Sequence, residues 1–537
     1  MNSYRLFPLL LWTVGGYCLA QNVDPASDPW TYEAAFRQVL LGNAPLQSIV
    51  LWPIPLAEVV SLLPQNEHPA YVLWYNSASS VGSRFLPQIA RHRFLATVAD
   101  TGFQMLLNAN IMLRGGAVRY GDTTSTPLLA RLGGQAFVRY GANAEGFVDI
   151  SNGARFAGSP EAALRIDPSL GRTLKFTIEA RRYFDRFAGY LQLRWGQARV
   201  RLGREPLSIG YSPIDNLILS PVAPMLDGIL LDIAHGPFRF SYLHAAAEGT
   251  DTAGQPVQSK YIVLHRVGWM PLSALCVALY DMVVYSGRGL DFAYLNPLAF
   301  FVSAGLQTAE RSNRDNSLLA LEVALRPQPR VLLYGTLLVD DLNYSTLFDT
   351  SVAGNTNKFG FQLGAATLLP IGQHGMQLAA EYVRLGPFVF SHRTIVNSWT
   401  HLNAPLGYAM QPNSDRWALQ LRYWLAPRAT LTLSADYTRH GENLLGPDGK
   451  VLTEIRNGER LPVGNVGGDI LRGDGDMLAP NRFLRGKRSD ARRYSVSAAI
   501  EVVPNVVLLV TASYLNRTGG SNPLGQLWGS AELRLGY

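Results

Sequence analysis

The nine residues WALQLRYWL, at positions 417–425, alternate between two kinds of side chain. The residues between the large apolar ones include Gln420 and Arg422, and the apolar set comprises Trp417, Leu419, Leu421, Tyr423 and Leu425. Because successive side chains of a strand point to opposite faces, the segment predicts a strand with one oily face and one mixed face. Such a strand requires an apolar environment on one side only, which is either a second sheet or lipid.

The same alternation recurs from about residue 104 onward, whereas helical periodicity does not. It is found in KFGFQLGA (358–365), RYSVSAAIEV (493–502) and LWGSAELRLGY (527–537). Aromatic residues tend to open or close the oily faces, which is typical of strands that cross a membrane interface. The last segment ends on Tyr537, which we interpret as a membrane-insertion signal for the outer-membrane barrel assembly machinery.

The connections between the alternating segments are short and long in turn. Tight turns are expected near residues 196, 236, 271, 328, 427 and 504, and the long stretches between them are 205–226, 247–258, 287–316, 342–357, 388–415 and 441–490. Bacterial outer-membrane barrels distribute their periplasmic turns and surface loops in this way, and sandwiches or propellers have no reason to do so. The sequence therefore predicts an all-β fold, a transmembrane antiparallel up-and-down β-barrel, with lipid as its outer solvent.

The segments number about 18, an even count that places both ends of the barrel in the periplasm. The strands are expected to begin near residues 104, 134, 173, 186, 197, 227, 238, 259, 273, 317, 330, 358, 376, 416, 429, 491, 505 and 526. A periplasmic C-terminus sends the longest loop, 441–490, to the cell surface. A barrel of this size encloses a water-filled bore unless loops or another segment plug it.

Three regions are expected along the chain. Residues 1–20 have the short positive start, apolar core and small final residues of a secretory signal peptide. Residues 21–100 are predicted to be a small helical periplasmic segment, with helices in PWTYEAAFRQVLLGNAP and PLAEVVSLLPQ, and residues 101–537 the barrel. The helical segment is a plug, a docking surface for a periplasmic partner or a spacer. Removal of the leader leaves Cys276 as the only cysteine, so no intrachain disulfide is expected.

Composition and motifs exclude several classes of function. The net charge of +7 is scattered, with no basic run that would favour nucleic acid. The histidines have no zinc-site spacing and the chain has no Gly-x-Ser-x-Gly elbow, so we expect no enzyme, no metal and no cofactor. The stretch GGDILRGDGDML (467–478) offers carboxylates suited to calcium, but a flexible surface loop is the favoured interpretation.

Several ordered stretches resemble the capsule-assembly Wzi family of outer-membrane proteins. They include VRLGREPLSIGYSPIDNLILSPVAPMLDGILLDIAHGPFRFSYLHA (200–245), KYIVLHRVGW (260–269), YDMVVYSGR (280–288), AEYVRLGPFVFSHR (380–393) and APLGYAMQPNSDRW (404–417). The resemblance spans most of residues 35–537. It implies an 18-stranded barrel with a helical segment on the periplasmic side. It also implies a non-enzymatic, lectin-like protein of the bacterial outer membrane that anchors capsular or other extracellular polysaccharide at the cell surface.

Sugar binding requires flat apolar faces with hydrogen-bonding groups beside them, and arginine can hold the carboxylates of an acidic polymer. The surface-loop residues predicted to contact polysaccharide are Tyr211, Tyr344, Phe390, Arg393, Trp399, Tyr408, Asn413, Asp415, Arg482 and Arg485. Charges predicted to face the lumen are Arg199, Arg201, Glu322 and Arg326. A charged lumen equally fits a porin or uptake channel for small polar or anionic solutes. A structural barrel that docks a periplasmic partner is a third possibility.

Overall fold

The computed structural model describes most of the chain from residue 29 onward. The described residues are 29–54, 62, 84–85, 96–100, 102–141, 143–173, 175–176, 180–251, 254–301, 305, 314–341, 357–475, 477–478, 482–503 and 506–536. The predicted signal peptide, most of the second predicted helix, Tyr344 and Tyr537 lie outside the described residues.

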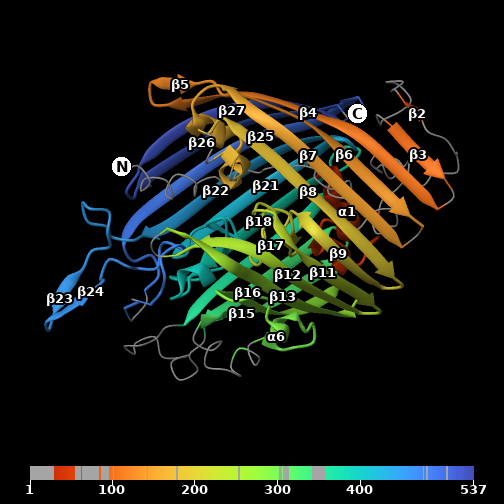
Figure 1. The fold of residues 1–537 in the computed structure, drawn as a ribbon. Coiled ribbons are helices and arrows are strands. Elements are labelled where there is room, and N and C mark those ends of the chain that lie inside the picture. The colour runs from red at the N-terminus through yellow and green to blue at the C-terminus, as the bar shows by residue number, and fades with distance from the viewer. Residues whose placement is uncertain are drawn as a thin grey trace.

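Eighteen antiparallel strands form a closed barrel, as predicted (Figure 1). The first and last strands of the ring close it through a ladder that runs from Gln526↔Tyr120 to Gly536↔Asn110. In ring order the strands are β4 (Phe103–Tyr120), β6 (Leu128–Tyr140), β7 (Ala144–Ala157), β8 (Tyr183–Trp195), β9 (Ala198–Glu205), β11 (Leu226–His235), β12 (Phe238–Thr250), β13 (Pro256–Leu272), β14 (Leu275–Ser286), β15 (Asn316–Gln328), β16 (Val331–Asp341), β17 (Lys358–Leu369), β18 (Met376–Leu385), β21 (Ser414–Ala426), β22 (Ala429–Glu442), β25 (Lys487–Val503), β26 (Val506–Gly519) and β27 (Leu524–Gly536).

Short strands extend or accompany this ring. β2 (Arg84–Phe85) and β3 (Ala96–Asp100) add to one end of β4, and β5 (Thr123–Ser125) pairs with its other end. Separate two-stranded ribbons are formed by β1 (Leu51–Trp52) with β10 (Ser208–Ile209), β19 (Thr400–His401) with β20 (Ala404–Pro405), and β23 (Glu454–Arg456) with β24 (Glu459–Leu461). We call the two rims of the barrel the short-turn end and the long-loop end. The short-turn end faces the periplasm by the usual distribution of such connections.

One predicted strand is wrong. The strand expected near residue 173 is replaced by α4 (Pro160–Ile166) and η5 (Pro168–Arg172), and the third strand is instead β7. Ser159 caps α4 by accepting from the backbone N–H of Ala162, and a proline follows each cap, which favours helical turns here. β7 reads AEGFVDISNGARFA, and its small and polar residues weaken the period-two signal. From β8 onward the predicted starts agree within four residues.

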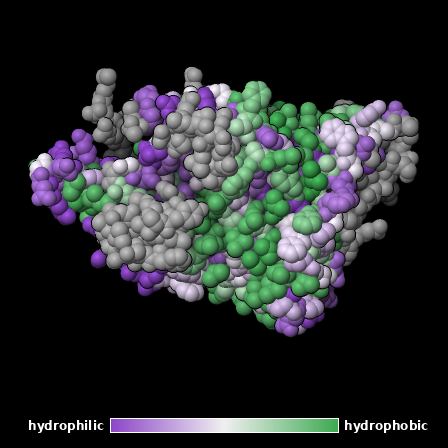
Figure 2. All heavy atoms as spheres, turned by 90° about the horizontal axis from the view of Figure 1, so that it is seen from below, coloured by the Kyte–Doolittle hydropathy of each residue, from purple (hydrophilic) through white to green (hydrophobic). Residues whose placement is uncertain are grey.

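The outer and inner faces of the strands follow the predicted alternation. In β21, Trp417 is 58% exposed and Gln420 is 1% exposed, and the same pattern holds in β17 and β25. Hydrophobic residues gather in the middle of the visible wall, and hydrophilic residues gather toward its ends (Figure 2). Aromatic pairs lie near both rims: Phe238 stacks on Trp269 at 6.4 Å near the short turns, and Tyr382 contacts Trp417 at 4.5 Å near the long loops. This distribution is typical of the outer wall of a transmembrane barrel.

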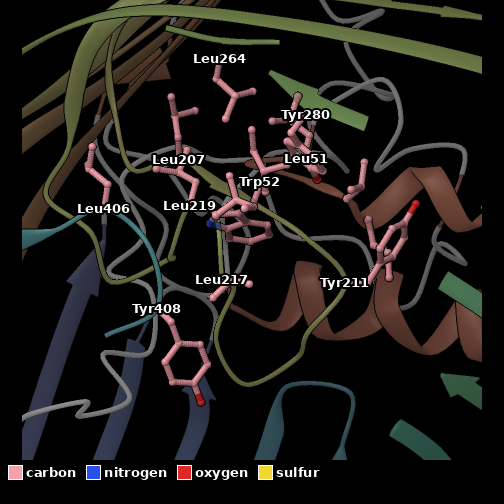
Figure 3. Packing of buried hydrophobic residues seen from close by; sticks show 14 of the residues in the cluster. Leu51, Trp52, Leu207, Tyr211, Leu217, Leu219, Leu264, Tyr280, Leu406 and Tyr408 are labelled. Atoms are coloured by element: carbon pink, nitrogen blue, oxygen red, sulfur yellow. The ribbon is translucent and has the colours of Figure 1, made fainter. Parts of the chain in front are cut away.

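The largest hydrophobic core lies inside the barrel. The N-terminal segment, with α1 (Pro29–Leu41) and η3 (Leu46–Ile49), enters from the short-turn end, and α1 lies within the ring of strands (Figure 1). The loop 206–225 enters from the long-loop end, and the two segments meet where Leu51 pairs with Ile209. Figure 3 shows Trp52 packed among Leu207, Leu217 and Leu219. The lumen is therefore filled by chain from both ends rather than lined by water alone.

Among the described residues, no helix combines the length and the apolar character needed to span a bilayer.

Candidate functional site

The N-terminal segment is fixed to the short-turn end by arginines of the barrel wall. Arg326 donates from Nη1 to the carbonyl oxygens of Val39 at 2.8 Å and Ala44 at 3.0 Å. The guanidinium of Arg422 pairs with Glu33 of α1 at 3.0 Å. These contacts satisfy backbone and side-chain groups of α1, so the segment is a plug bound to the barrel interior. Arg326, predicted as a lumen charge, is one of its anchors.

The other predicted lumen charges lie inside the barrel in ion pairs. Arg199 pairs with Asp232 at 3.0 Å, and Arg201 pairs with Glu205 at 2.7 Å. Glu322 accepts from Arg266 at 3.0 Å and from the hydroxyl of Tyr280 at 2.8 Å. Each charge has an opposite partner across or along the wall. These side chains therefore hold neighbouring strands together.

Most of the predicted sugar-contacting side chains are not on the surface. Trp399 is 1% exposed and donates from Nε1 to the carbonyl oxygen of Ile218 at 2.9 Å. The side chains that are buried in this way are Tyr211, Phe390, Trp399, Tyr408, Asn413 and Asp415. The expectation that they are exposed is wrong: the loops that carry most of them fold inward and pack, and Asp415 lies on β21, where Tyr382 and Arg439 cover it. By contrast, Arg393, Arg482 and Arg485 are exposed at the long-loop end, and their contact with sugar stays a prediction.

A buried carboxylate holds the inward-folded loops to the wall. Glu381 on β18 accepts from the Ser212 hydroxyl at 2.6 Å, the Tyr408 hydroxyl at 2.5 Å, the Tyr334 hydroxyl at 3.1 Å and the Gln362 amide at 3.0 Å. Ser212 and Tyr408 belong to two different loops. One wall residue thus joins both loops, and removal of its oxygens leaves several buried donors without an acceptor.

Two wall lysines and a buried aspartate hold the loops further. Lys260 donates from Nζ to the carbonyl oxygens of Ser398 at 3.0 Å and Thr400 at 2.6 Å. Lys358 pairs with Asp474 at 2.8 Å, which ties part of the Gly-Asp stretch to the wall. Burial raises the pKa of Asp215, whose carboxylate accepts from the Ser220 hydroxyl and from a backbone N–H. Among the described residues, no group of three or more His, Cys, Asp or Glu is arranged to hold a metal.

A cleft passes through the wall at the long-loop end, beside β8. The ladder between β8 and β9 runs from Trp195↔Ala198 only to Gly189↔Arg204, so the described ladder leaves residues 183–188 without a partner on this side. The cleft that opens there has a volume of about 540 Å³. It is lined by loop 206–225, by η5 and by charged side chains: Arg131, Arg172, Lys175, Arg186, Arg204, Asp167, Asp185, Asp227 and Glu248. Both lumen-facing residues such as Arg131 and outward ones such as Asp185 line it.

Arg131 is the distinctive charge of this cleft. It is 7% exposed, and its Nε has no hydrogen-bond acceptor among the described residues. The neighbouring lumen cation Arg114 is paired with Asp167 at 2.9 Å and with Glu532. Sequence reasoning missed Arg131 because the strand was expected to begin near residue 134. The alternation of LLARLGGQ, continued back to Leu129, was the signal that places this arginine on the inner face.

A second cavity of about 310 Å³ lies beneath loop 443–486 at the same end. Its floor holds Asp436, which accepts from Arg416 at 2.9 Å and Arg493 at 2.8 Å. Asp469 of the loop also lines it, and burial raises the pKa of that carboxyl. Asp436 is paired with Arg416 and Arg493, whereas Arg517 also lines this cavity and its Nη2 has no hydrogen-bond acceptor among the described residues. The cavity is therefore a second place where an anionic group could bind.

The fold and its plugged lumen define a bacterial outer-membrane β-barrel with charged cavities at its cell-surface end. The model of the capsule assembly protein Wzi family matches residues 115–477, and the chain belongs to this family. The fold is similar to that of Wzi from Escherichia coli, an outer-membrane protein involved in group 1 capsule assembly and described as a carbohydrate-binding β-barrel. That likeness has a TM-score of 0.56 and 12% identity, and it covers 95% of this chain and 98% of the other.

Two porin-type structures are also similar. For OccD3 from Pseudomonas aeruginosa, the TM-score is 0.43 at 10% identity, with 88% of this chain and 99% of the other covered. For a BenF-like porin from Pseudomonas fluorescens, the TM-score is 0.44 at 10% identity, with 80% and 99% covered. These two likenesses are weaker and support no further conclusion. No curated protein matches the sequence.

Proposed function

We propose that this barrel binds and anchors capsular or other extracellular polysaccharide at the cell surface without chemical change to the polymer. Membership of the Wzi family supports the proposal, as does the carbohydrate binding ascribed to the Escherichia coli protein of similar fold. The observation that carries it for this chain is the charged cleft at the cell-surface end, which is open to the polymer while the lumen behind it is filled.

The cleft beside β8 is the proposed binding site, and the proposed ligand group is an anionic one, such as the carboxylate of an acidic sugar. Arginine presents a planar set of donors that matches a carboxylate, and a donor without a protein acceptor is available to a ligand. Arg131 supplies such a donor within the cleft. Arg393, Arg482 and Arg485 are proposed as outer contacts at the same rim.

Substitution of Arg131 tests this site. We expect Arg131→Gln to weaken binding of an acidic oligosaccharide, such as an oligogalacturonate, about tenfold or more, because one charge-assisted contact is lost. Binding is measured by calorimetry on the purified barrel in nanodiscs, with a neutral malto-oligosaccharide as the comparison ligand.

Arg119→Gln is the matched control. Arg119 is exposed on β4 near the same rim, and its Nε donates to the carbonyl oxygen of Gly121 at 2.9 Å. This control should bind as the parent does. If the Arg131 variant and the parent bound the acidic oligosaccharide with equal affinity, Arg131 would not be a ligand contact. If the parent bound no polysaccharide at all, the proposed function would be contradicted.

The alternatives gain less support. A porin requires an open bore, whereas the lumen here holds α1, loop 206–225 and an apolar core. The porin hypothesis would be favoured only by a steady ionic current through the intact barrel. A docking role for α1 is disfavoured because its apolar residues are buried in the barrel. We retain as proposals the export of the chain by a cleaved leader at 1–20 and recognition of the C-terminal strand by the assembly machinery.

A further inference from the structure

The connection between β14 and β15 is described at residues 287–301, 305 and 314–315, and its first part does not stay above the rim of the barrel. Its first half, which includes α6 (Phe292–Leu295), lies outside the ring of strands (Figure 1). Tyr294 and Phe301 are buried there against side chains of three strands. Tyr294 accepts at its carbonyl from the Tyr242 hydroxyl at 3.0 Å, and Phe301 stacks on His265 with 3.9 Å between ring centroids.

The strand alternation shows that these contacts are on the outer wall. Arg266 and Tyr280 both bind Glu322 inside the barrel. Their immediate neighbours along the strands, His265 and Asp281, therefore point outward, and the register places these two residues directly opposite each other. The loop thus covers a part of the wall that carries an imidazole and a carboxylate, groups that are costly to expose to hydrocarbon.

The loop supplies a hydrogen bond to Asp281 and to Tyr285, whereas Nε2 of His265 has no hydrogen-bond partner among the described residues. Asp281 accepts from the backbone N–H of Phe301 at 2.5 Å. The hydroxyl of Tyr285 lies 3.0 Å from Nε2 of His244 and accepts from the backbone N–H of Asp291 at 3.3 Å. The covering segment therefore satisfies part of the polar outer wall by hydrogen bonds, and Phe301 shields the imidazole of His265 by stacking on it.

The covered region lies at membrane depth. A strand rises about 3.4 Å per residue, and a tilt of about 40° leaves about 2.6 Å of climb along the barrel axis. An apolar band about 25 Å tall therefore spans about ten residues from the short-turn rim. Asp281 is the seventh residue of β14 from that rim, so Asp281 and the Phe301 N–H bound to it lie within the band.

The loop is held in this position by a compact set of ionic contacts. Arg288 binds Asp315 in a bidentate manner, at 2.8 Å and 2.6 Å, and pairs with Asp291 at 3.1 Å. The hydroxyl of Tyr294 donates to the same Asp315 at 2.8 Å. These contacts join the start of the loop, α6 and the residue before β15, so the covering segment is fixed at both of its ends.

The other side of the segment is apolar and uncovered. Phe292 is 85% exposed and Leu298 is 88% exposed, and Leu290 and Phe300 are also exposed. On the wall beside the loop, the outward side chain of Leu279 is exposed as well. The apolar surface of the loop is thus continuous with the lipid-facing surface of the strands. Exposure of this many large apolar groups to water is unfavourable.

We propose that residues 290–300 form a lipid-binding surface that inserts into the outer leaflet, where the acyl chains of membrane lipid contact Phe292 and Leu298. The loop serves as an external anchor that sets the depth and tilt of the barrel. This function is independent of polysaccharide binding. Continuity with the lipid-facing wall, rather than exposure alone, identifies lipid as the occupant.

The test uses nitroxide labels at single cysteines in reconstituted bilayers, in a Cys276→Ser background. Phe292→Cys and Leu298→Cys carry the labels on the loop, Leu279→Cys is the lipid-facing reference, and Ile455→Cys is the matched control. Ile455 is an apolar residue 77% exposed on the β23–β24 hairpin. Heat-modifiable migration in gels verifies that each variant is folded.

Collision rates with oxygen, which partitions into lipid, and with nickel ethylenediaminediacetate, which stays in water, are then compared. We expect the oxygen-to-nickel ratio at 292 and 298 to resemble that at 279 and to exceed that at 455 severalfold. A ratio at 292 and 298 equal to that at 455 would overturn the proposal, since the loop would then lie in water. Dipolar broadening between labels on separate molecules would also overturn it, by assigning the surface to a second copy.

Discussion

Deletion of residues 29–54 should strongly destabilise the barrel, whereas removal of a plug from a water-filled porin would not. The inner faces of β11–β18 carry apolar side chains such as Leu243 and Leu264, which pack on this segment. The segment itself buries Phe36, Val39, Leu40, Leu46 and Ile49. The deletion exposes the wall side chains that pack on these five, and at about 1.5–3 kcal/mol for each large apolar side chain the lost burial costs roughly 10 kcal/mol. We expect loss of heat-modifiable migration and a large fall in the guanidinium midpoint of tryptophan fluorescence.

The matched control is excision of residues 454–461, the β23–β24 ribbon, which extends away from the barrel (Figure 1). Its residues are mostly exposed, so the excision should leave both readouts near those of the parent. If the deletion of 29–54 behaved like this control, the N-terminal segment would be a dispensable spacer and the apolar lumen core would have to be stabilised by other contacts.

Glu381→Ala should release the inward-folded loops. The substitution removes the common acceptor of Ser212, Tyr334, Gln362 and Tyr408. Each buried donor that is left without an acceptor costs about 1–3 kcal/mol. Because Ser212 and Tyr408 belong to loops rather than to the ring, we expect the loops to loosen before the barrel unfolds. Limited proteolysis should cut within 206–225 and 387–413 in the variant and spare them in the parent.

Two further substitutions make this result specific. Glu381→Gln keeps one acceptor oxygen and should have a smaller effect on proteolysis than the alanine variant. Glu454→Ala removes a carboxylate that pairs with Arg456 in an exposed ribbon, where an ion pair contributes about 0–1 kcal/mol, so it should have no effect. Protection of the loops that survives in Glu381→Ala would mean that Lys260 and Lys358 hold them without this hub.

The sequence was sufficient to predict the barrel because each strand must satisfy lipid on one face. That requirement produces the alternation of Trp417, Leu419 and Leu421 with inward residues, and it also fixes which side of the strand bears Arg199 and Glu322. The strand near 173 was placed wrongly because β7 is rich in small and polar residues, which satisfy the outer face poorly. Period two is informative only where the two faces differ strongly.

The positions of the loop aromatics could not be predicted from the pattern. Trp399 and Tyr408 lie in irregular segments. In such a segment the sequence pattern around an aromatic residue is the same whether its ring faces a sugar or packs in the lumen. A signal for the filled lumen was nevertheless present in β13, where YIVLH places Ile262 and Leu264 on the inner face beside outward Val263. A strand that is apolar on both faces is buried on both faces. In a barrel with a water-filled bore, the inner face of the strand would instead contact water.

The most direct test of polysaccharide anchoring is the distribution of polymer in cells that lack this gene. We expect total polymer to stay unchanged while the cell-bound fraction falls and the fraction in the medium rises. The parent gene, but not its Arg131→Gln variant, should restore retention of an acidic polymer. Cell-bound polymer that is unchanged by the deletion would contradict the proposal that this barrel anchors polysaccharide at the cell surface.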